Sequence, residues 1–113
     1  MDQAELILTD NLREYLELAE EAYIKEKYNS SATLFFKALC AGIDLYVYQK
    51  RGFVPSSHTH RFRVLEEHYP ELYRLIDKDF SFYQDSYTTK LSKEACEVLA
   101  DDARYIAKEV LKE

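Results

Sequence analysis

Glycine and proline are nearly absent from this sequence, with two of each among 113 residues. Each hairpin of an all-β protein needs its own turn, and turns depend on residues that fix the backbone angles or accept unusual ones. A chain with so few of these residues is expected to form long helices. Its length allows one domain over residues 1–113, because two full cores would not fit. We therefore predict an all-α, antiparallel up-and-down bundle of four to five helices.

Hydrophobic periodicity divides the chain into helices. Apolar residues recur every three or four positions along most of its length, and the interruptions fall at residues typical of helix starts and ends. Gly52 is expected to end the second helix, and Ser92 to cap the last one. The pattern predicts helices over residues 4–27, 29–51, 58–68 and 70–77, a further piece over residues 80–91, and a last helix over residues 93–112.

The second predicted helix is apolar around most of its circumference, so it must be covered on most sides. One stripe consists of Ala32, Phe35, Phe36, Leu39, Ile43, Tyr46 and Val47, and the other of Leu34, Ala38, Ala41, Leu45 and Tyr48. A narrow semi-polar strip separates them, made of Thr33, Lys37, Cys40 and Asp44. Two interpretations are open. Either the helix is central and covered within its own chain, or the second stripe is the interface of a two-fold homodimer.

The charge of the chain is unevenly distributed. The formal net charge is −6 and residues 1–28 are strongly acidic, whereas residues 50–74 carry five bases against three acids. An acidic protein is a poor general binder of polyanions, because affinity for phosphates grows with the number of positive contacts. A local basic region can still hold a nucleotide or a short RNA. The candidate contacts in this region are Lys50, Arg51, Arg61 and Arg63.

Metal binding, secretion and membrane insertion find little support in the sequence. The three histidines all lie within residues 58–68 without a clear ligand spacing, so we expect no metal site and no cofactor. Cys40 and Cys96 fall inside helical patterns and not in a disulfide framework. The chain lacks a signal-peptide pattern and an apolar run of about 20 residues. These features predict a cytoplasmic protein without a membrane span.

The one candidate for catalysis is an arginine paired with a histidine. Metal-independent RNA cleavage, in which the ribose 2′-hydroxyl attacks, needs a cation to hold phosphate and a group to move a proton. Arg61 and His68 are seven residues apart, on nearly the same face of a helix and ~10 Å apart along its axis. Arg63 and His68 are five apart and diverge. In the structural alternative, Arg61 pairs with an acid and His68 ends a helix favourably.

The arrangement of motifs over residues 27–62 resembles that of HEPN domains, the higher eukaryote and prokaryote nucleotide-binding family. Members share a long first helix, an entry with tyrosine and asparagine or arginine into an Ala-rich second helix, and a Gly-containing loop that opens a third helix. In this sequence the corresponding features are Tyr28-Asn29 through Ala32, Lys37-Ala38-Leu39, Gly52 and Ser57-His58. The order and lengths of the elements agree over essentially the whole chain.

The resemblance implies a helical domain that commonly dimerises and is often encoded beside a minimal nucleotidyltransferase as a toxin–antitoxin pair. In active members the domain is an RNase with an Arg-x4-6-His motif. Four residues separate Arg63 from His68 and six separate Arg61 from His68, so both arginines fit that spacing. Active members usually carry a polar residue directly after the arginine, where this chain has Phe62 or Val64.

We therefore expect a non-catalytic or weakly catalytic HEPN-type binding module. It would be a homodimer associated with nucleotide, RNA or a minimal nucleotidyltransferase partner. Two alternatives stay open. One is a metal-independent endoribonuclease that uses Arg61 or Arg63 with His68. The other is a purely structural protein-interaction domain, which needs only the second apolar stripe of the central helix.

Overall fold

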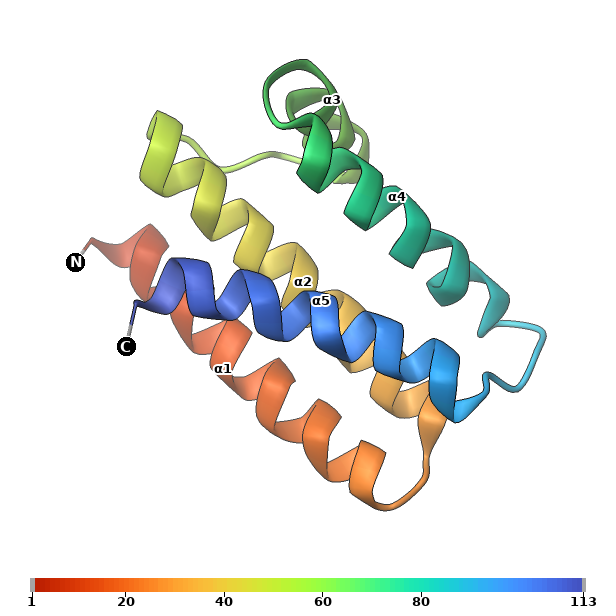
Figure 1. The fold of residues 1–113 in the computed structure, drawn as a ribbon. Coiled ribbons are helices and arrows are strands. Elements are labelled where there is room, and N and C mark those ends of the chain that lie inside the picture. The colour runs from red at the N-terminus through yellow and green to blue at the C-terminus, as the bar shows by residue number, and fades with distance from the viewer. Residues whose placement is uncertain (1, 113) are drawn as a thin grey trace.

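The computed structural model describes residues 2–112, and over this range it contains five α-helices and no strand. The helices are α1 (Gln3–Ile24), α2 (Tyr28–Arg51), α3 (His58–His68), α4 (Pro70–Asp85) and α5 (Lys93–Leu111). Figure 1 shows that α1, α2, α4 and α5 form an up-and-down bundle, with the short α3 at one end. The prediction of an all-α bundle is confirmed.

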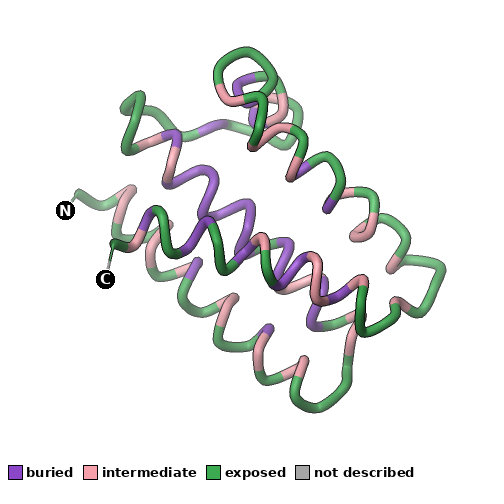
Figure 2. Tube along the Cα trace, viewed as in Figure 1, coloured by how far each residue is buried: buried purple, intermediate pink, exposed green. Residues whose placement is uncertain are grey.

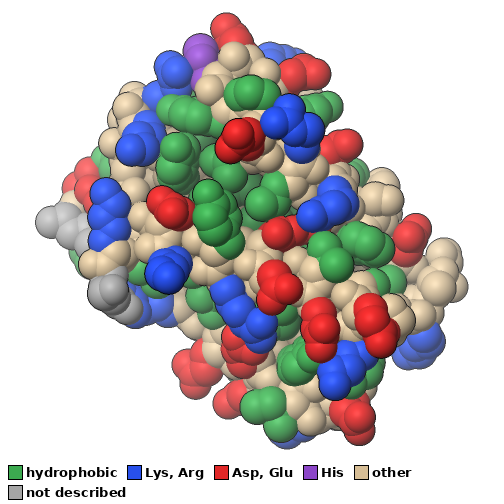
Figure 3. All heavy atoms as spheres, in the orientation of Figure 1, with side chains coloured by type: hydrophobic (Ala, Val, Ile, Leu, Met, Phe, Trp, Pro, Cys, Tyr) green, Lys and Arg blue, Asp and Glu red, His purple; other side chains and the backbone are tan. Residues whose placement is uncertain are grey.

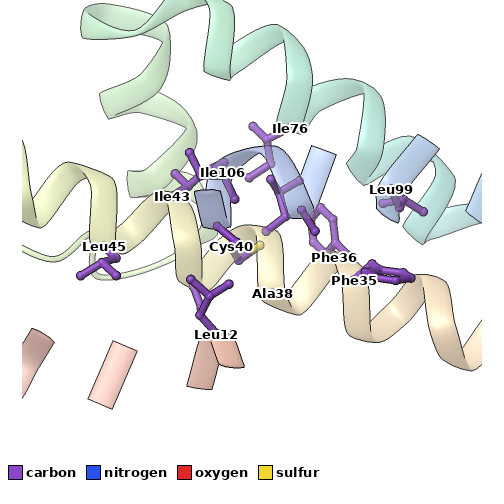
Figure 4. Close-up of a cluster of buried hydrophobic side chains, with 14 of the residues drawn as sticks. Leu12, Phe35, Phe36, Ala38, Cys40, Ile43, Leu45, Ile76, Leu99 and Ile106 are labelled. Carbon is purple, nitrogen blue, oxygen red and sulfur yellow. The ribbon is translucent and has the colours of Figure 1, made fainter. Parts of the chain in front are cut away.

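The long central helix α2 organises the bundle. Helices α1, α5 and α4 all pack against it, and more than half of its 24 residues are buried. Buried positions follow α2 along most of its length in Figure 2. Figure 4 shows side chains of α2 meeting Leu12 of α1, Ile76 of α4 and Ile106 of α5. The core therefore surrounds one helix instead of lying between two equal layers.

The interface expected on the second stripe of α2 needs correction. Ala38 and Leu45 are 0% and 1% exposed in the single chain, and Ala41 is also buried. Helix α1 covers this stripe, and the Tyr48 hydroxyl at its end donates a hydrogen bond to Asp2 at the start of α1. Leu34 and Tyr48 are only partly exposed. The stripe is core within one chain, and a second copy cannot contact most of it.

Side-chain caps and one glycine set the helix ends where the sequence predicts them. The Ser57 hydroxyl accepts a hydrogen bond from the backbone of His60, and the Ser92 hydroxyl accepts one from Ala95, both at 3.1 Å. These bonds satisfy amide groups that the first turn of a helix leaves free. Gly52 ends α2 with φ of 80°, in the left-handed region that glycine adopts at no steric cost.

The fourth helix is longer than the sequence analysis expects. It runs without a break over Pro70–Asp85, whereas we predicted a helix ending near residue 77 and a separate piece over residues 80–91. The gap between the two predicted pieces falls at the charged pair Lys78-Asp79. Asp79 is instead completely buried in the middle of the helix, and the residues after Asp85 form turns and a loop.

Asn29 ties this loop to the first turn of α2. Its side-chain amide donates hydrogen bonds to the carbonyl oxygens of Ser86 and Thr89, at 3.1 and 2.9 Å. Its side-chain oxygen accepts a third bond, 2.8 Å long, from the backbone of Leu91. One amide thus satisfies three backbone groups between α4 and α5. This gives a structural reason for the asparagine in the Tyr28-Asn29 pair.

The other glycine of the chain, Gly42, allows α2 and α5 to lie close together. A Cβ atom built on Gly42 would be 2.7 Å from Cγ2 of Ile106, closer than two carbon atoms pack without displacement. Ile106 is itself buried. Any larger residue at this position would push α5 away from α2.

By length and composition alone, α2 could cross a membrane. An 18-residue window within it has a mean hydropathy of 1.2. However, 72% of that window is buried inside the protein, which is the burial expected for the core helix of a bundle.

A buried pair of carboxyl groups joins α4 to α5. Asp79 is completely buried, and no hydrogen-bond donor in the described part of the chain reaches its oxygens. Burial, together with the neighbouring carboxylate of Asp102, raises the pKa of Asp79 to about 9. Near neutral pH Asp79 therefore keeps its proton and donates it to Asp102. The Asp102 carboxylate also has Lys78 Nζ at 3.3 Å.

This protonated carboxyl makes the stability of the fold depend on pH. The folded chain keeps the proton of Asp79 up to a pKa of about 9, whereas the unfolded chain releases it near the ordinary value of 3.8. The free energy of unfolding should therefore fall as the pH rises from about 4 to about 9. Asp79→Asn retains a donor for Asp102 but cannot ionise, so it should flatten this decline and exceed the parent in stability near pH 8. Urea unfolding across this range measures both curves, with the exposed Asp77→Asn as control. Parallel curves for parent and Asp79→Asn would contradict the assignment.

Candidate functional site

The semi-polar strip of α2 faces away from α5. Lys37 on this strip is exposed and Thr33 is partly exposed, whereas Cys40 and Asp44 are buried. With about 100° between successive residues, Thr33, Lys37 and Asp44 lie opposite the positions that pack against α5. Two hollows open along this strip, of about 240 and about 460 Å³, and Tyr83 of α4 lines both of them. We call the two together the polar-strip groove. Its other lining residues include Asn11 and Tyr15 of α1, His58 and Arg61 of α3, and Tyr87 beyond α4.

A buried ion pair lies at one end of the groove. Arg61 Nε donates to Asp44 Oδ1 at 2.7 Å, and Arg61 Nη2 donates to Asp44 Oδ2 at 2.8 Å. Both residues are buried, with exposed fractions of 9% for Arg61 and 7% for Asp44. Two parallel charge-assisted bonds of this kind fix the guanidinium group in position. The pair explains why the apolar α2 carries an aspartate at this point.

The third nitrogen of the Arg61 guanidinium group, Nη1, contacts a histidine. Nη1 of Arg61 lies 2.7 Å from Nδ1 of His58. Because arginine only donates, Nδ1 must accept, and the ring carries its hydrogen on Nε2. Burial lowers the pKa of His58, and the charge of Arg61 lowers it further. His58 is therefore a neutral donor at neutral pH, stacked against Phe36 with 6.2 Å between ring centroids.

The middle of the groove combines one free cation with tyrosine rings. Lys37 is exposed and has no ion-pair partner among residues 2–112. Tyr83 stacks on Phe36, with ring centroids 4.6 Å apart, and its hydroxyl is 2.9 Å from that of Tyr87. Tyr87 is 73% exposed. Such a surface can hold a flat aromatic group beside an anionic one.

The thiol of Cys40 in the groove is not a reactive nucleophile. Cys40 is buried on α2, and this burial raises its pKa to about 12. A thiol with so high a pKa has almost no thiolate at neutral pH. Cys40 therefore acts as a small core residue, and the groove is a binding surface without a cysteine nucleophile.

The structure does not bring the predicted arginine and histidine together. Arg61 lines the polar-strip groove, but His68 lines a separate hollow with Tyr46, Tyr69 and Glu109, which we call the tyrosine cleft. His68 ends α3, two turns beyond Arg61, and within residues 2–112 its only ionic neighbour is Glu67 at 3.8 Å. Arg63 is exposed and lines neither hollow. Of the two readings of Arg61, the pairing with an acid is the observed one.

The other predicted RNA contacts lie at the end of α2. Nζ of Lys50 is 5.5 Å from the ring centroid of Tyr46, and Cζ of Arg51 is 5.4 Å from that of Tyr69. Arg51 Nε also donates to the Tyr69 hydroxyl at 3.1 Å. These two cations remain exposed, but they lie beside the tyrosine cleft and not in the groove with Arg61.

Sequence reasoning missed the residues that make the groove, apart from Arg61. Lys37 and Asp44 were noted only as a gap between two stripes, although polar residues in so apolar a helix need a reason to be there. Asn11, Tyr15 and Tyr83 carry no local signal, because their roles depend on how α1 and α4 pack beside α2.

No group of three or more metal-ligating side chains occurs within residues 2–112. Comparisons of the chain with models of protein families, with curated proteins and with solved structures find no match.

The buried ion pair should be needed for stability as a unit. Arg61→Leu or Asp44→Leu leaves one charge buried without a partner and should cost about 3–5 kcal/mol. Replacing both with leucine removes both charges and should cost less than either single change. The exposed Arg63→Ala should change stability by no more than about 0.5 kcal/mol. Chemical denaturation of the four variants measures this. Additive single and double effects would show that the two charges do not interact.

Proposed function

We propose that this chain is a HEPN-type helical binding module that holds a nucleotide or a short single-stranded RNA in the polar-strip groove. The observation that carries the proposal is the composition of the groove. It contains a free lysine, one exposed and two partly buried tyrosine rings, and polar amide and hydroxyl groups, and its one carboxylate is neutralised by Arg61. Stacking on aromatic rings beside a cation is a common way to bind single-stranded nucleic acid.

The local charge of the groove favours an anion despite the net charge of −6. Asp44 and Arg61 cancel, His58 is neutral, and Lys37 leaves one net positive charge. Only a few phosphates can be engaged by so few cations, so binding should be weak and strongly salt-dependent. A mononucleotide or a short strand fits this surface better than a long duplex.

The separation of Arg61 from His68 argues against the endoribonuclease alternative. Arg61 is fully used by Asp44 and His58, and His68 lines the tyrosine cleft instead. Cleavage would need an arginine free to contact phosphate and a histidine near the same ribose. Accordingly, the proposal is for binding without cleavage.

The binding test compares a variant of Lys37 on α2, in the groove, with a variant of Lys108 on α5, outside it. Lys37→Gln should weaken binding of a fluorescein-labelled oligouridylate and reduce the slope of log affinity against log salt by about 0.7. Tyr87→Ala should weaken binding by about 1–3 kcal/mol without changing that slope. Lys108→Gln on α5 is the charge-matched control and should leave binding unchanged. Fluorescence anisotropy measures all four proteins.

Two outcomes would count against this function. Equal losses in Lys37→Gln and Lys108→Gln would mean that the oligonucleotide binds by general charge and not in the groove. Cleavage of the same oligonucleotide in EDTA that is lost in His68→Ala would favour the endoribonuclease instead.

We further propose that the module is a homodimer and that its partner, as the family resemblance implies, is a minimal nucleotidyltransferase. The interior stripe of α2 cannot serve as the interface, but α1 exposes Leu6, Ile7 and Leu18, at 48%, 52% and 43%. Ile7 and Leu18 lie on the same side of α1, about three turns apart.

The outer face of α1 is therefore the surface on which we expect the dimer. Sedimentation equilibrium should give twice the chain mass of 13.4 kDa, and Ile7→Glu should shift the protein to monomer without lowering its stability. Leu12→Glu, at a buried position of the same helix, should instead unfold it. A parent that stays monomeric over the concentration range would refute the dimer.

A further inference from the structure

The tyrosine cleft is a second hollow, on the α5 side of the molecule. Its volume is about 410 Å³, which is within the range of small-ligand sites. Three tyrosines line it, one each from α2, the α3–α4 junction and α5, and they are Tyr46, Tyr69 and Tyr105. Leu72, Leu75 and Ile106 give it an apolar wall. Figure 3 shows side chains of the hydrophobic class gathered on this face, with charged groups around them.

Two carboxylates line the cleft from different helices. Glu71 belongs to the first turn of α4 and Glu109 to the last turns of α5. Neither has a hydrogen bond or an ion pair with any residue of the described chain. Burial raises the pKa of Tyr46, and Tyr69 and Glu109 add to this shift. The negative charge of Glu109 is therefore felt inside the cleft.

The rings of the cleft already attract cations within the chain. Lys50 and Arg51 lie over Tyr46 and Tyr69, at 5.5 and 5.4 Å. Tyr46 and Tyr69 meet edge to face, with 5.2 Å between centroids and 84° between planes. Tyr105 is 53% exposed and presents its ring at the mouth of the cleft. A cation near such rings is stabilised by their electron-rich faces.

We propose that the tyrosine cleft binds a small organic dication with an aliphatic chain, the chemistry of a linear diamine. The two ammonium groups pair with Glu71 and Glu109, and the methylene chain packs on Leu72, Leu75 and Ile106. Both carboxylates are exposed, so the preference follows from pairing: a dication pairs both, a single cation pairs one, and a neutral ligand pairs neither.

The nearby Lys50 gives the proposal a further testable consequence. Its charge lies over the ring of Tyr46 and opposes a second cation in the same cleft. Removing that charge should therefore strengthen diamine binding, an effect that a merely apolar pocket would not show.

The test is a calorimetric titration of the whole chain with diaminobutane, with butanediol as the neutral ligand of the same length. Diaminobutane should bind saturably at one site, and butanediol should not. Glu71→Gln and Glu109→Gln should each weaken binding by about five-fold. Lys50→Gln should strengthen it. Glu17→Gln, at an exposed acid of α1, is the charge-matched control and should leave affinity unchanged.

The absorbance of ionised tyrosine gives a second readout. Bound diamine should lower the pKa that burial raises in Tyr46, and Tyr46→Phe should abolish this change in the spectrum. Equal binding of butanediol would overturn the proposal, and so would an equal loss in Glu17→Gln. Failure of diamine binding would leave the proposal of RNA binding through Lys37 unaffected, because the tyrosine cleft and the polar-strip groove are lined by different residues.

Discussion

The structure depends on the burial of α2. A helix with apolar residues around most of its circumference has to be covered on several sides, and α1, α5 and α4 supply that cover. Gly42 lets α5 approach closely, and α1 closes over the stripe of Ala38 and Leu45. On the semi-polar strip, Lys37 then remains exposed and Thr33 partly exposed, while Cys40 and Asp44 are buried. The groove and the packing are thus two results of one constraint, because the side of α2 that is not apolar is the side on which ligands can reach the central helix.

Two buried polar pairs are held in this apolar frame in different ways. Asp44 and Arg61 have opposite charges and satisfy each other through two short bonds. Asp79 and Asp102 have the same charge, so one of them must keep a proton. The first pair fixes α3 on α2, and its arginine adds to burial in lowering the pKa of His58. The second pair links α4 to α5, and it is stable only while that proton stays in place. Each pair joins helices that share few other polar contacts.

The helices, their caps and the central place of α2 could be predicted from the sequence, because periodicity, serine caps and Gly52 are local signals. The break expected near Lys78-Asp79 was wrong, since charged residues are compatible with a helix interior, and α4 continues through Asp79, which is buried. The candidate site was harder to predict. The spacing of Arg61 and His68 is a property of one helix, whereas their use depends on which neighbours each one meets. Arg61 meets Asp44, seventeen residues earlier in the chain, and no local pattern announces that contact.

The three hydrogen bonds of Asn29 bear on the order in which the bundle assembles. They join the start of α2 to backbone groups 57, 60 and 62 residues further along. Closing so long a segment costs more chain entropy than closing the short turn between α1 and α2. The α1–α2 hairpin can therefore form from local contacts, while the Asn29 bonds must wait until α3 and α4 have folded back. The loop-closure argument therefore places the Asn29 bonds after the α1–α2 hairpin in the order of assembly.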